Sequence, residues 1–170
     1  RSFFAYNGNL MPSDDFSEFF IPSSKYIYEV FRVQQGIALF IEDHMDRLLK
    51  TAFLEKITLP FTRNEILADI FLLIQNNPVD DGNIKIFISL PASNPVSRLV
   101  YYTPHQYPTP EQCTNGVRVD LFEAERNNPN AKVMDISLRN ATEVAKKQRD
   151  TYEVLLVDHN GNITEGSRSN

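Results

Sequence analysis

The chain has 170 residues, of which 42% are hydrophobic and 23% are charged, and its formal net charge is −5 at pH 7. This length fits one ordinary domain, or a small domain with part of another, and the composition is that of a folded globular protein rather than a disordered one. The longest apolar runs, such as residues 70–74, are far shorter than the roughly 20 residues of a membrane span. No cluster of Lys and Arg is long enough to track a phosphate backbone, and no apolar run is long enough to span a membrane, so we expect neither nucleic acid nor a membrane as a partner.

Cys113 is the single cysteine, so no disulfide can form within the chain. Residues 109–112, which precede it, carry no cation that would activate the thiol, and we interpret Cys113 as an ordinary side chain rather than a nucleophile. The sequence opens at Arg1 without a basic and then apolar signal segment. Together these features favour a reducing, cytoplasmic location.

Strands and helices alternate in the first part of the sequence. Residues 26–33 are rich in Tyr, Ile, Val and Phe and predict a strand. Gln35-Gly36 predicts a turn into a second strand over residues 37–41, so that the two form a hairpin. A helix follows over residues 42–55, because acidic residues begin it and apolar side chains recur at helical spacing.

A second helix has a distinct start signal. Thr62 and Glu65 form a capping box ahead of a broad apolar face. This helix ends before the turn residues 77–78, and the chain then predicts two paired strands, residues 84–90 and 99–103.

The stretch 104–116 contains three prolines and little periodicity, and we interpret it as a linker. After it we expect a strand over residues 117–122 and a loop rich in Asn that leads to Lys132. A helix over residues 136–149 and a strand over residues 152–158 complete the prediction.

These elements predict two domains. Residues 1–112 form a small α+β domain, an antiparallel sheet with two helices. Residues 117–170 contain one helix and two or three strands, which are too few to close a core unless they join another sheet. We therefore expect this segment to be the first part of a second domain.

One lysine and one glutamate stand out in the second segment. Lys132 precedes a helix, and Glu165 follows the next strand and turn. Each alone is more often a solvated surface charge. Together, however, residues 130–132 and 152–166 resemble the core signature of the class IV aminotransferases, in which a lysine precedes a helix and E-x-L-L-x-D leads to T-E-G-x-x-x-N. The spacing of the lysine and the glutamate is also that of the family.

A second match lies upstream. Residues 28–33, then Gly36, then residues 42–48 resemble the pattern F/Y-E-x-x-R/K-V…G…E-H-x-D-R-L. On these two motifs the chain is identified as a member of fold type IV of the pyridoxal 5'-phosphate (PLP) enzymes, which comprises branched-chain aminotransferases, D-amino-acid aminotransferases and aminodeoxychorismate lyases. The resemblance implies a D-amino-acid-aminotransferase-like fold, with the α+β domain followed by an α/β barrel-like domain, and PLP as the cofactor.

The resemblance also implies residue roles. Lys132 matches the lysine that binds the cofactor aldehyde and then moves a proton, which requires its amine to be deprotonated. Glu165 matches the carboxylate that keeps the pyridine nitrogen protonated. Arg47 matches the arginine that grips the phosphate through two donors. His44 and Asp46, in the same motif, are expected to order the helix rather than to perform chemistry.

Further residues match the surroundings of the cofactor and the substrate. Tyr28 is the best candidate for a substrate contact, and Arg32 is a second one. Asn170 and the backbone of residues 167–169 match the loop that closes over the cofactor. No metal site is expected.

Three departures from the family pattern bear on the substrate. Residues 24–27 replace a Gly-Asp-Gly-type stretch before the first motif. Ser137 stands where branched-chain enzymes often place a tyrosine, and Asp135 stands where the lyases often have asparagine. The PLP assignment is unaffected, whereas the branched-chain assignment is weakened.

Three hypotheses follow. The first is a PLP-dependent aminotransferase that acts on a branched-chain-like amino acid and a 2-oxo acid, as a homodimer. The second keeps the cofactor but makes the protein an aminodeoxychorismate lyase, which releases pyruvate by β-elimination. The third is a degenerate, non-catalytic relative, and it applies only if the chain truly ends at Asn170, because family chains continue past T-E-G-x-x-x-N and supply further phosphate donors.

Overall fold

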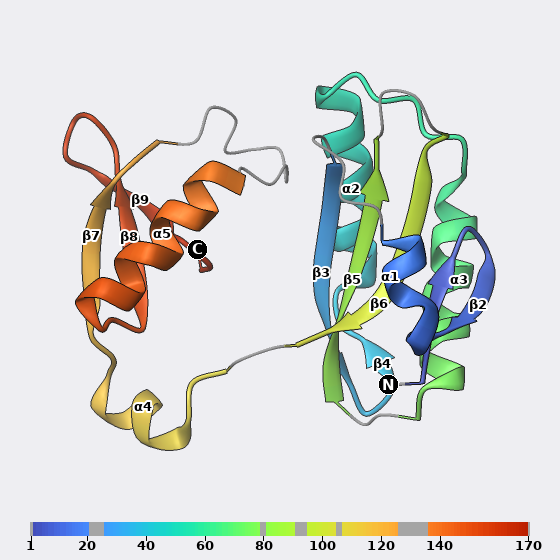
Figure 1. The fold of residues 1–170 in the computed structure, drawn as a ribbon, viewed down its shortest axis with the longest axis horizontal. Helices are drawn as coiled ribbons and strands as arrows, with labels where there is room; N and C mark the ends of the chain where they lie inside the picture. The colour runs from blue at the N-terminus through green and yellow to red at the C-terminus, as the bar shows by residue number, and fades with distance from the viewer. Residues whose placement is uncertain are drawn as a thin grey trace. The chain divides into compact units, whose positions relative to one another are not determined.

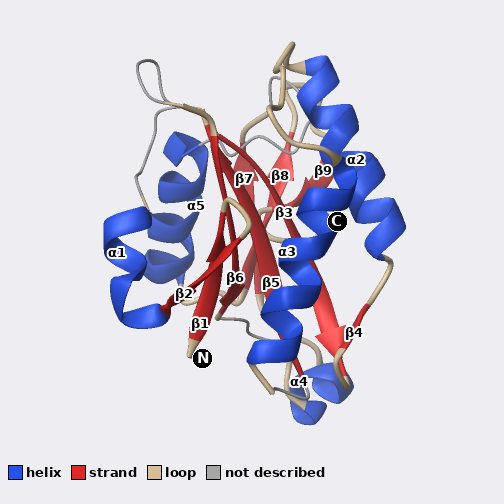
Figure 2. Ribbon diagram, turned by 90° about the vertical axis from the view of Figure 1, so that its right-hand side faces the viewer, coloured by secondary structure: helices blue, strands red, loops and turns tan. Residues whose placement is uncertain are grey.

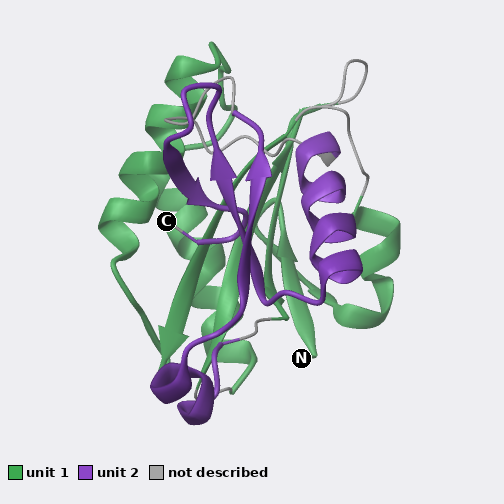
Figure 3. Ribbon diagram, turned by 90° about the vertical axis from the view of Figure 1, so that its left-hand side faces the viewer, with its two compact units in different colours: residues 1–105, 130–133 green, residues 106–129, 134–170 purple. Residues whose placement is uncertain are grey.

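The computed structural model describes residues 2–20, 26–78, 81–90, 95–104, 107–125 and 136–169. It divides into two compact units (Figure 3). Unit 1 contains the described residues up to 104, and unit 2 contains those from 107 onward. Each unit has its own sheet, and each is described separately below.

Unit 1 is built on a six-stranded sheet with the strand order β2-β1-β6-β5-β3-β4 (Figure 1). All its neighbouring strands run antiparallel. The strands are β1 (Phe3–Tyr6), β2 (Asn9–Pro12), β3 (Tyr26–Gln34), β4 (Ile37–Ala38), β5 (Asp81–Ser89) and β6 (Ser97–Thr103). The β1–β2 turn is made by Asn7 and Gly8, both at positive φ, which is the geometry that closes two-residue hairpins.

The two longer helices of unit 1 cover one face of this sheet. They are α2 (Ile41–Leu54) and α3 (Arg63–Asn76). The shorter α1 (Phe16–Phe19), which follows a single 3-10 turn (Ser13–Asp15), lies on the opposite side of the sheet (Figure 2). The face under α2 and α3 is therefore the more fully buried one, and on the other face Tyr28, Val30 and Lys85 are only half-buried.

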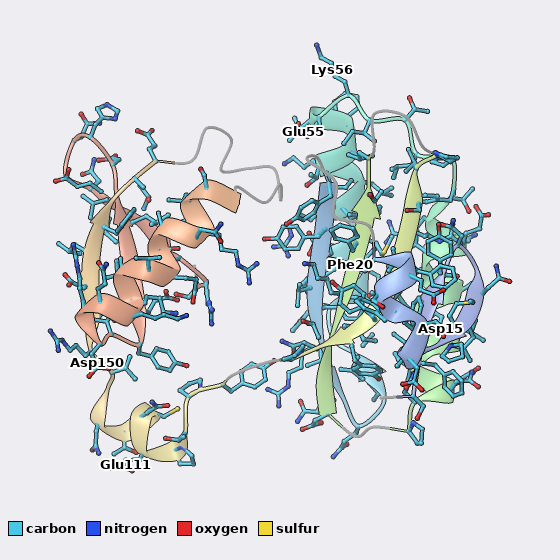
Figure 4. All side chains as sticks on the ribbon, viewed as in Figure 1. Asp15, Phe20, Glu55, Lys56, Glu111 and Asp150 are labelled. Carbon is cyan, nitrogen blue, oxygen red and sulfur yellow. The ribbon has the colours of Figure 1, made fainter. Side chains whose placement is uncertain are left out.

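The alternation of side chains along the strands divides them between these faces. On β5, Ile84, Ile86 and Ile88 are fully buried and join the core beneath α2 and α3. Phe87 points to the opposite face. There its ring centroid lies 5.1 Å from that of Phe20, the residue at the end of α1 (Figure 4). Burial of large apolar side chains on both faces stabilises the unit, at about 2 kcal/mol for each of them.

Unit 2 contains a three-stranded sheet with the order β7-β8-β9. Its elements are α4 (Pro110–Asn115), β7 (Val119–Glu123), α5 (Ile136–Arg149), β8 (Glu153–Val157) and β9 (Ile163–Gly166). β7 and β8 are parallel, and α5 packs against both; β8 and β9 are antiparallel. A helix between parallel strands is the usual crossover, since parallel neighbours cannot be joined by a short turn.

The predicted elements agree with the structure to within three residues except for two, and β1, β2, α1 and β9 were not predicted. The strand expected over residues 37–41 is only Ile37–Ala38, because Phe40 adopts a left-handed conformation with φ 52° and α2 begins at the next residue. The predicted linker 104–116 contains the helix α4, which Thr109 caps and Pro110 begins. Proline is compatible with a first helical turn, where its missing N–H is not needed.

Candidate cofactor site

A salt bridge between β3 and α2 is the centre of the candidate site in unit 1. Arg47 donates two hydrogen bonds to Glu29, from Nε to Oε1 at 2.7 Å and from Nη2 to Oε2 at 2.6 Å. The Glu29 side chain is fully buried, whereas 42% of the Arg47 side chain is exposed. Two parallel bonds of this kind fix the plane of the guanidinium as well as its position.

His44 is the third member of this group and lies one turn before Arg47 on α2. Its Nδ1 is 3.0 Å from Glu29 Oε2 and 3.2 Å from Arg47 Nη2. One ring nitrogen can donate to the carboxylate or accept from the guanidinium, but not both at once. The shorter contact and the buried negative charge favour donation to Glu29.

Arg47 is a permanent cation with part of its guanidinium accessible. Its hydrogen bond to Glu29 is the main reason why the pKa of Arg47 lies above its ordinary value; burial opposes this, and the charges of Glu29 and Tyr28 add to it. Within the described ranges its hydrogen bonds come from Nε and Nη2, so the Nη1 edge remains for a ligand. A cationic edge of this kind suits a phosphate.

Asp46 has a different environment from its neighbours in the motif. It forms an ion pair with Arg63, the first residue of α3, and the Arg63 guanidinium also donates to the carbonyl of Glu42 at 3.3 Å. These contacts connect the start of α3 to α2. Asp46 thus contacts α3, and its role in ordering α2 stays a prediction.

The opposite face of β3 carries the candidate substrate contact. Tyr28 is half-buried there, and the Lys85 Nζ of the neighbouring strand β5 lies 4.9 Å from the centre of the Tyr28 ring. The same amine is 5.8 Å from the ring of Tyr26 and 5.5 Å from that of Phe87. Lys85 was not identified from the sequence, although a lysine in the middle of an apolar strand is a signal that could have marked it.

Arg32, the second candidate substrate contact, lies further along β3. Its Nη2 is 3.7 Å from Asp81 Oδ2, and just under half of each side chain is exposed. Four residues of strand, roughly 13 Å, separate its Cα from that of Tyr28. The structure therefore places Arg32 in an ion pair near the end of the strand rather than beside Tyr28.

In unit 2, Glu165 lies on β9 opposite Leu156 of β8 and is half-buried. The chain then closes into a tight loop, in which the Gly166 N–H donates to the Ser169 carbonyl at 2.8 Å. A Cβ on Gly166 would collide with the Ser169 hydroxyl and would lie only 3.1 Å from the Ser169 carbonyl oxygen. Glycine is thus required directly after the candidate glutamate.

Glu153, at the start of β8, holds this loop. Its buried carboxylate accepts hydrogen bonds from the Ser167 hydroxyl at 2.5 Å, the Arg168 N–H at 3.3 Å and the Ser169 hydroxyl at 3.5 Å. Arg168 also forms an ion pair with Glu143 of α5 at 2.8 Å. The family motif contains Glu153, but its function as the anchor of the loop became visible only in the structure.

Several predicted residues lie outside the described ranges, namely Lys132, Asn170, Asp135 and residues 24–25. Ser137 is described and exposed in the first turn of α5. Among the residues whose placement is described, no group of three or more His, Cys, Asp or Glu could hold a metal. In the same ranges no helix has the length and apolarity needed to cross a membrane.

The fold and the site together define a class of protein. An antiparallel α+β unit that carries a partly exposed arginine, followed by a β-α-β-β unit with a glutamate before a glycine, has the fold of solved aminotransferases. Over 98% of this chain, a branched-chain amino acid aminotransferase of Escherichia coli has a TM-score of 0.80 at 17% identity, with 62% of that chain covered. A hypothetical aminotransferase of Mycobacterium tuberculosis, in its α-ketoglutarate- and PMP-bound form, has a TM-score of 0.78 at 14% identity, covering 98% of this chain and 65% of that one.

Sequence comparison identifies the family. The model for "Amino-transferase class IV" matches residues 26–170, and the chain belongs to this family. A D-alanine aminotransferase of Listeria monocytogenes serotype 4b (strain F2365) is 25% identical over 92 residues, which are 54% of this chain and 31% of that protein. The chain spans less than two thirds of the length of the solved structures named above.

The cofactor of this family is PLP, as the sequence predicted, and a PLP-bound form of the Mycobacterium tuberculosis protein has the same fold, with a TM-score of 0.75. The residues of this chain fit such a group. Arg47 presents a positive edge that a buried carboxylate holds in place, which suits the phosphate. Glu165 supplies a carboxylate on a strand end whose following loop is held by Glu153.

Proposed function

We propose that the protein is a PLP-dependent aminotransferase that transfers an amino group between an amino acid and a 2-oxo acid. The observation that carries the proposal is the Arg47 guanidinium, held by Glu29 within a family motif and open to an anion on its outer edge. Family membership supports the same conclusion.

Each candidate residue has a chemical role in this proposal. Arg47 binds the cofactor phosphate, and Asn170 contributes to the cofactor pocket. Glu165 keeps a proton on the pyridine nitrogen. Lys132 binds the cofactor through its amine and afterwards carries a proton to and from the substrate Cα. When bound, PLP supplies an aldehyde that captures amino groups and a ring that withdraws electrons from the Cα.

The substrate side of the proposal rests on β3 and β5. Tyr28 and Arg32 are the proposed contacts, and Lys85 adds a positive charge over the Tyr28 ring. Amino acids and 2-oxo acids both carry a carboxylate, which such a cation attracts. The branched-chain enzymes among the similar structures support branched-chain-like substrates, while the similarity to a D-alanine aminotransferase supports testing D-alanine.

We further propose a cytoplasmic homodimer with two domains, residues 1–112 and residues 117–170, joined by the linker 104–116. The two compact units support the division into domains. The single cysteine, which lies exposed on α4, is consistent with a reducing compartment.

The test is a titration of the protein with PLP, followed by visible absorption, in the wild type and in Lys132→Ala. We expect a band of lysine-bound cofactor in the wild type and none in the variant, because no other amine is proposed to bind the aldehyde. Transfer from leucine and from D-alanine to 2-oxoglutarate is then measured. Retention of the band in Lys132→Ala contradicts the assignment of the lysine.

The same assay separates the other hypotheses. Release of pyruvate from aminodeoxychorismate without an amino acceptor would identify a lyase instead of an aminotransferase. Absence of any cofactor band in the wild type would identify a non-catalytic relative.

A further inference from the structure

We propose that Glu29 is a positioning residue for the cofactor phosphate, and that it acts by fixing the guanidinium of Arg47. This inference rests on the proposed function, since it requires Arg47 to bind the phosphate. It extends the proposed function because part of the affinity for the phosphate is assigned to Glu29, whose side chain is fully buried and does not face a ligand.

Burial explains why the geometry of the pair is so well defined. A carboxylate without solvent contact must have its lone pairs satisfied within the protein. Glu29 has Arg47 on both oxygens and His44 on Oε2, and all three contacts are between 2.6 and 3.0 Å. Moving the guanidinium would remove two charge-assisted hydrogen bonds from a buried carboxylate, so Arg47 remains in one orientation.

The position of Glu29 on its strand adds a second constraint. It lies between Ile27 and Phe31 on the face of β3 that packs under α2, and both neighbours belong to the apolar core. The carboxylate therefore cannot move with its partner in the way a surface residue could. A long, flexible arginine is thereby held in place before any ligand arrives, which lowers the entropy lost on binding.

The charge of Glu29 and its effect on the orientation of Arg47 predict opposite results when Glu29 is replaced by a neutral residue. The negative charge of Glu29 offsets part of the attraction between Arg47 and a phosphate dianion. If charge dominated, Glu29→Gln would strengthen phosphate binding. If orientation dominates, as we propose, Glu29→Gln weakens it, because glutamine replaces one acceptor oxygen by an NH2 donor and cannot form the two parallel bonds to separate oxygens.

The experiment compares the affinities of PLP and of pyridoxal, which lacks the phosphate, for the full chain. Their ratio isolates the contribution of the phosphate from that of Lys132. We expect Glu29→Gln to lower the ratio by about tenfold and Arg47→Ala to lower it at least as much. In both variants the affinity for pyridoxal stays within about twofold of the wild type, because the aldehyde site is untouched.

A matched control exists in the same unit. Asp69 is also a buried carboxylate, and it pairs with the buried Arg98 at 2.6 Å between α3 and β6. Asp69→Asn weakens the core in a comparable way, but we expect it to leave the ratio unchanged. Glu29→Asp is a second variant, in which the buried charge remains but the side chain is one methylene shorter; we expect it to lower the ratio as well. It keeps the test available if Glu29→Gln does not fold.

The outcomes distinguish failure of the positioning role from failure of the proposed function. If Arg47→Ala lowers the ratio but Glu29→Gln and Glu29→Asp do not, the positioning role is wrong while the cofactor site stands. If Asp69→Asn lowers the ratio as much as Glu29→Gln, the effect is one of general stability and the positioning role is also wrong. If the wild type binds PLP no better than pyridoxal, the proposed function fails together with the inference.

Discussion

At some positions in this chain the immediate contacts restrict which residue can be accommodated. Gly166 is the clearest case, because its φ is ordinary and the demand on it is purely steric. The loop after Glu165 turns back so tightly that the Ser169 hydroxyl occupies the space of a side chain. The family motif places a glycine here, and the structure supplies the physical reason.

We predict that Gly166→Ala destabilises the protein by about 2 kcal/mol, the usual cost of forcing an extra carbon into a packed site. Glu153 would lose its contacts with the displaced loop, so PLP affinity should fall as well. Chemical denaturation and the PLP titration measure the two effects. Gly161→Ala is the control: its φ of 82° strains an alanine, but nothing lies within 4 Å of the new carbon. Equal PLP affinities in the two variants would show that the loop tolerates the side chain.

At the scale of elements, the start of α3 is specified locally. The Glu65 N–H donates to the Thr62 hydroxyl at 3.3 Å, and the Thr62 N–H donates to the Glu65 carboxylate at 2.7 Å. These bonds satisfy backbone donors that a helix otherwise leaves without partners. Such contacts join residues three positions apart, which is why the sequence was sufficient to predict them.

We predict that Thr62→Ala lowers the free energy of unfolding by about 1 kcal/mol, and that Thr62→Ser retains most of it. Chemical denaturation of both variants is the measurement, and equal losses of stability would contradict the role of the hydroxyl.

The stability from this capping box also depends on pH. The hydrogen bond from the Thr62 backbone lowers the pKa of Glu65, so its contribution is present above the ordinary glutamate pKa and is lost as the pH falls through the lowered one.

At the scale of the whole molecule, the two units differ in how much of their sheets they bury. In unit 1 the strands β3 and β5 are paired over nine residues; their side chains are buried on the face under α2 and α3 and half-buried over most of the other face. In unit 2 the sheet has three strands, and large apolar side chains remain exposed on it, namely Val119, Leu121 and Ile163 at 45%, 52% and 60%. Buried strands open less often than strands with exposed faces.

We predict that amide hydrogens of β3 and β5 exchange at least ten times more slowly than those of β7 and β9. Hydrogen exchange of the full chain followed by mass spectrometry measures this directly. Strand β8 is the internal reference. It is the central strand of its sheet and should exchange most slowly within unit 2. Equal protection in both units would mean that other residues complete the sheet of unit 2 in solution.

The sequence by itself determined the local structure and the family. Helix 136–149, the capping box of α3 and the two motifs depend on residues that are near one another in the chain, so periodicity and spacing are sufficient. The early end of β4 and the helix α4 were not predicted, because a left-handed phenylalanine and a proline in a first turn are hard to distinguish from ordinary strand and linker patterns.

Only the tertiary structure decided which side chains meet. Glu29 and Arg47 are 18 positions apart, and Tyr28 and Lys85 come together only because β3 and β5 pair in one register. A glutamate between two core residues of a strand was a signal in the sequence, but its partner could not be read from spacing, because a buried charge is satisfied in space rather than along the chain. The residues that hold the site were therefore identified by packing, and those proposed to perform its chemistry by motif.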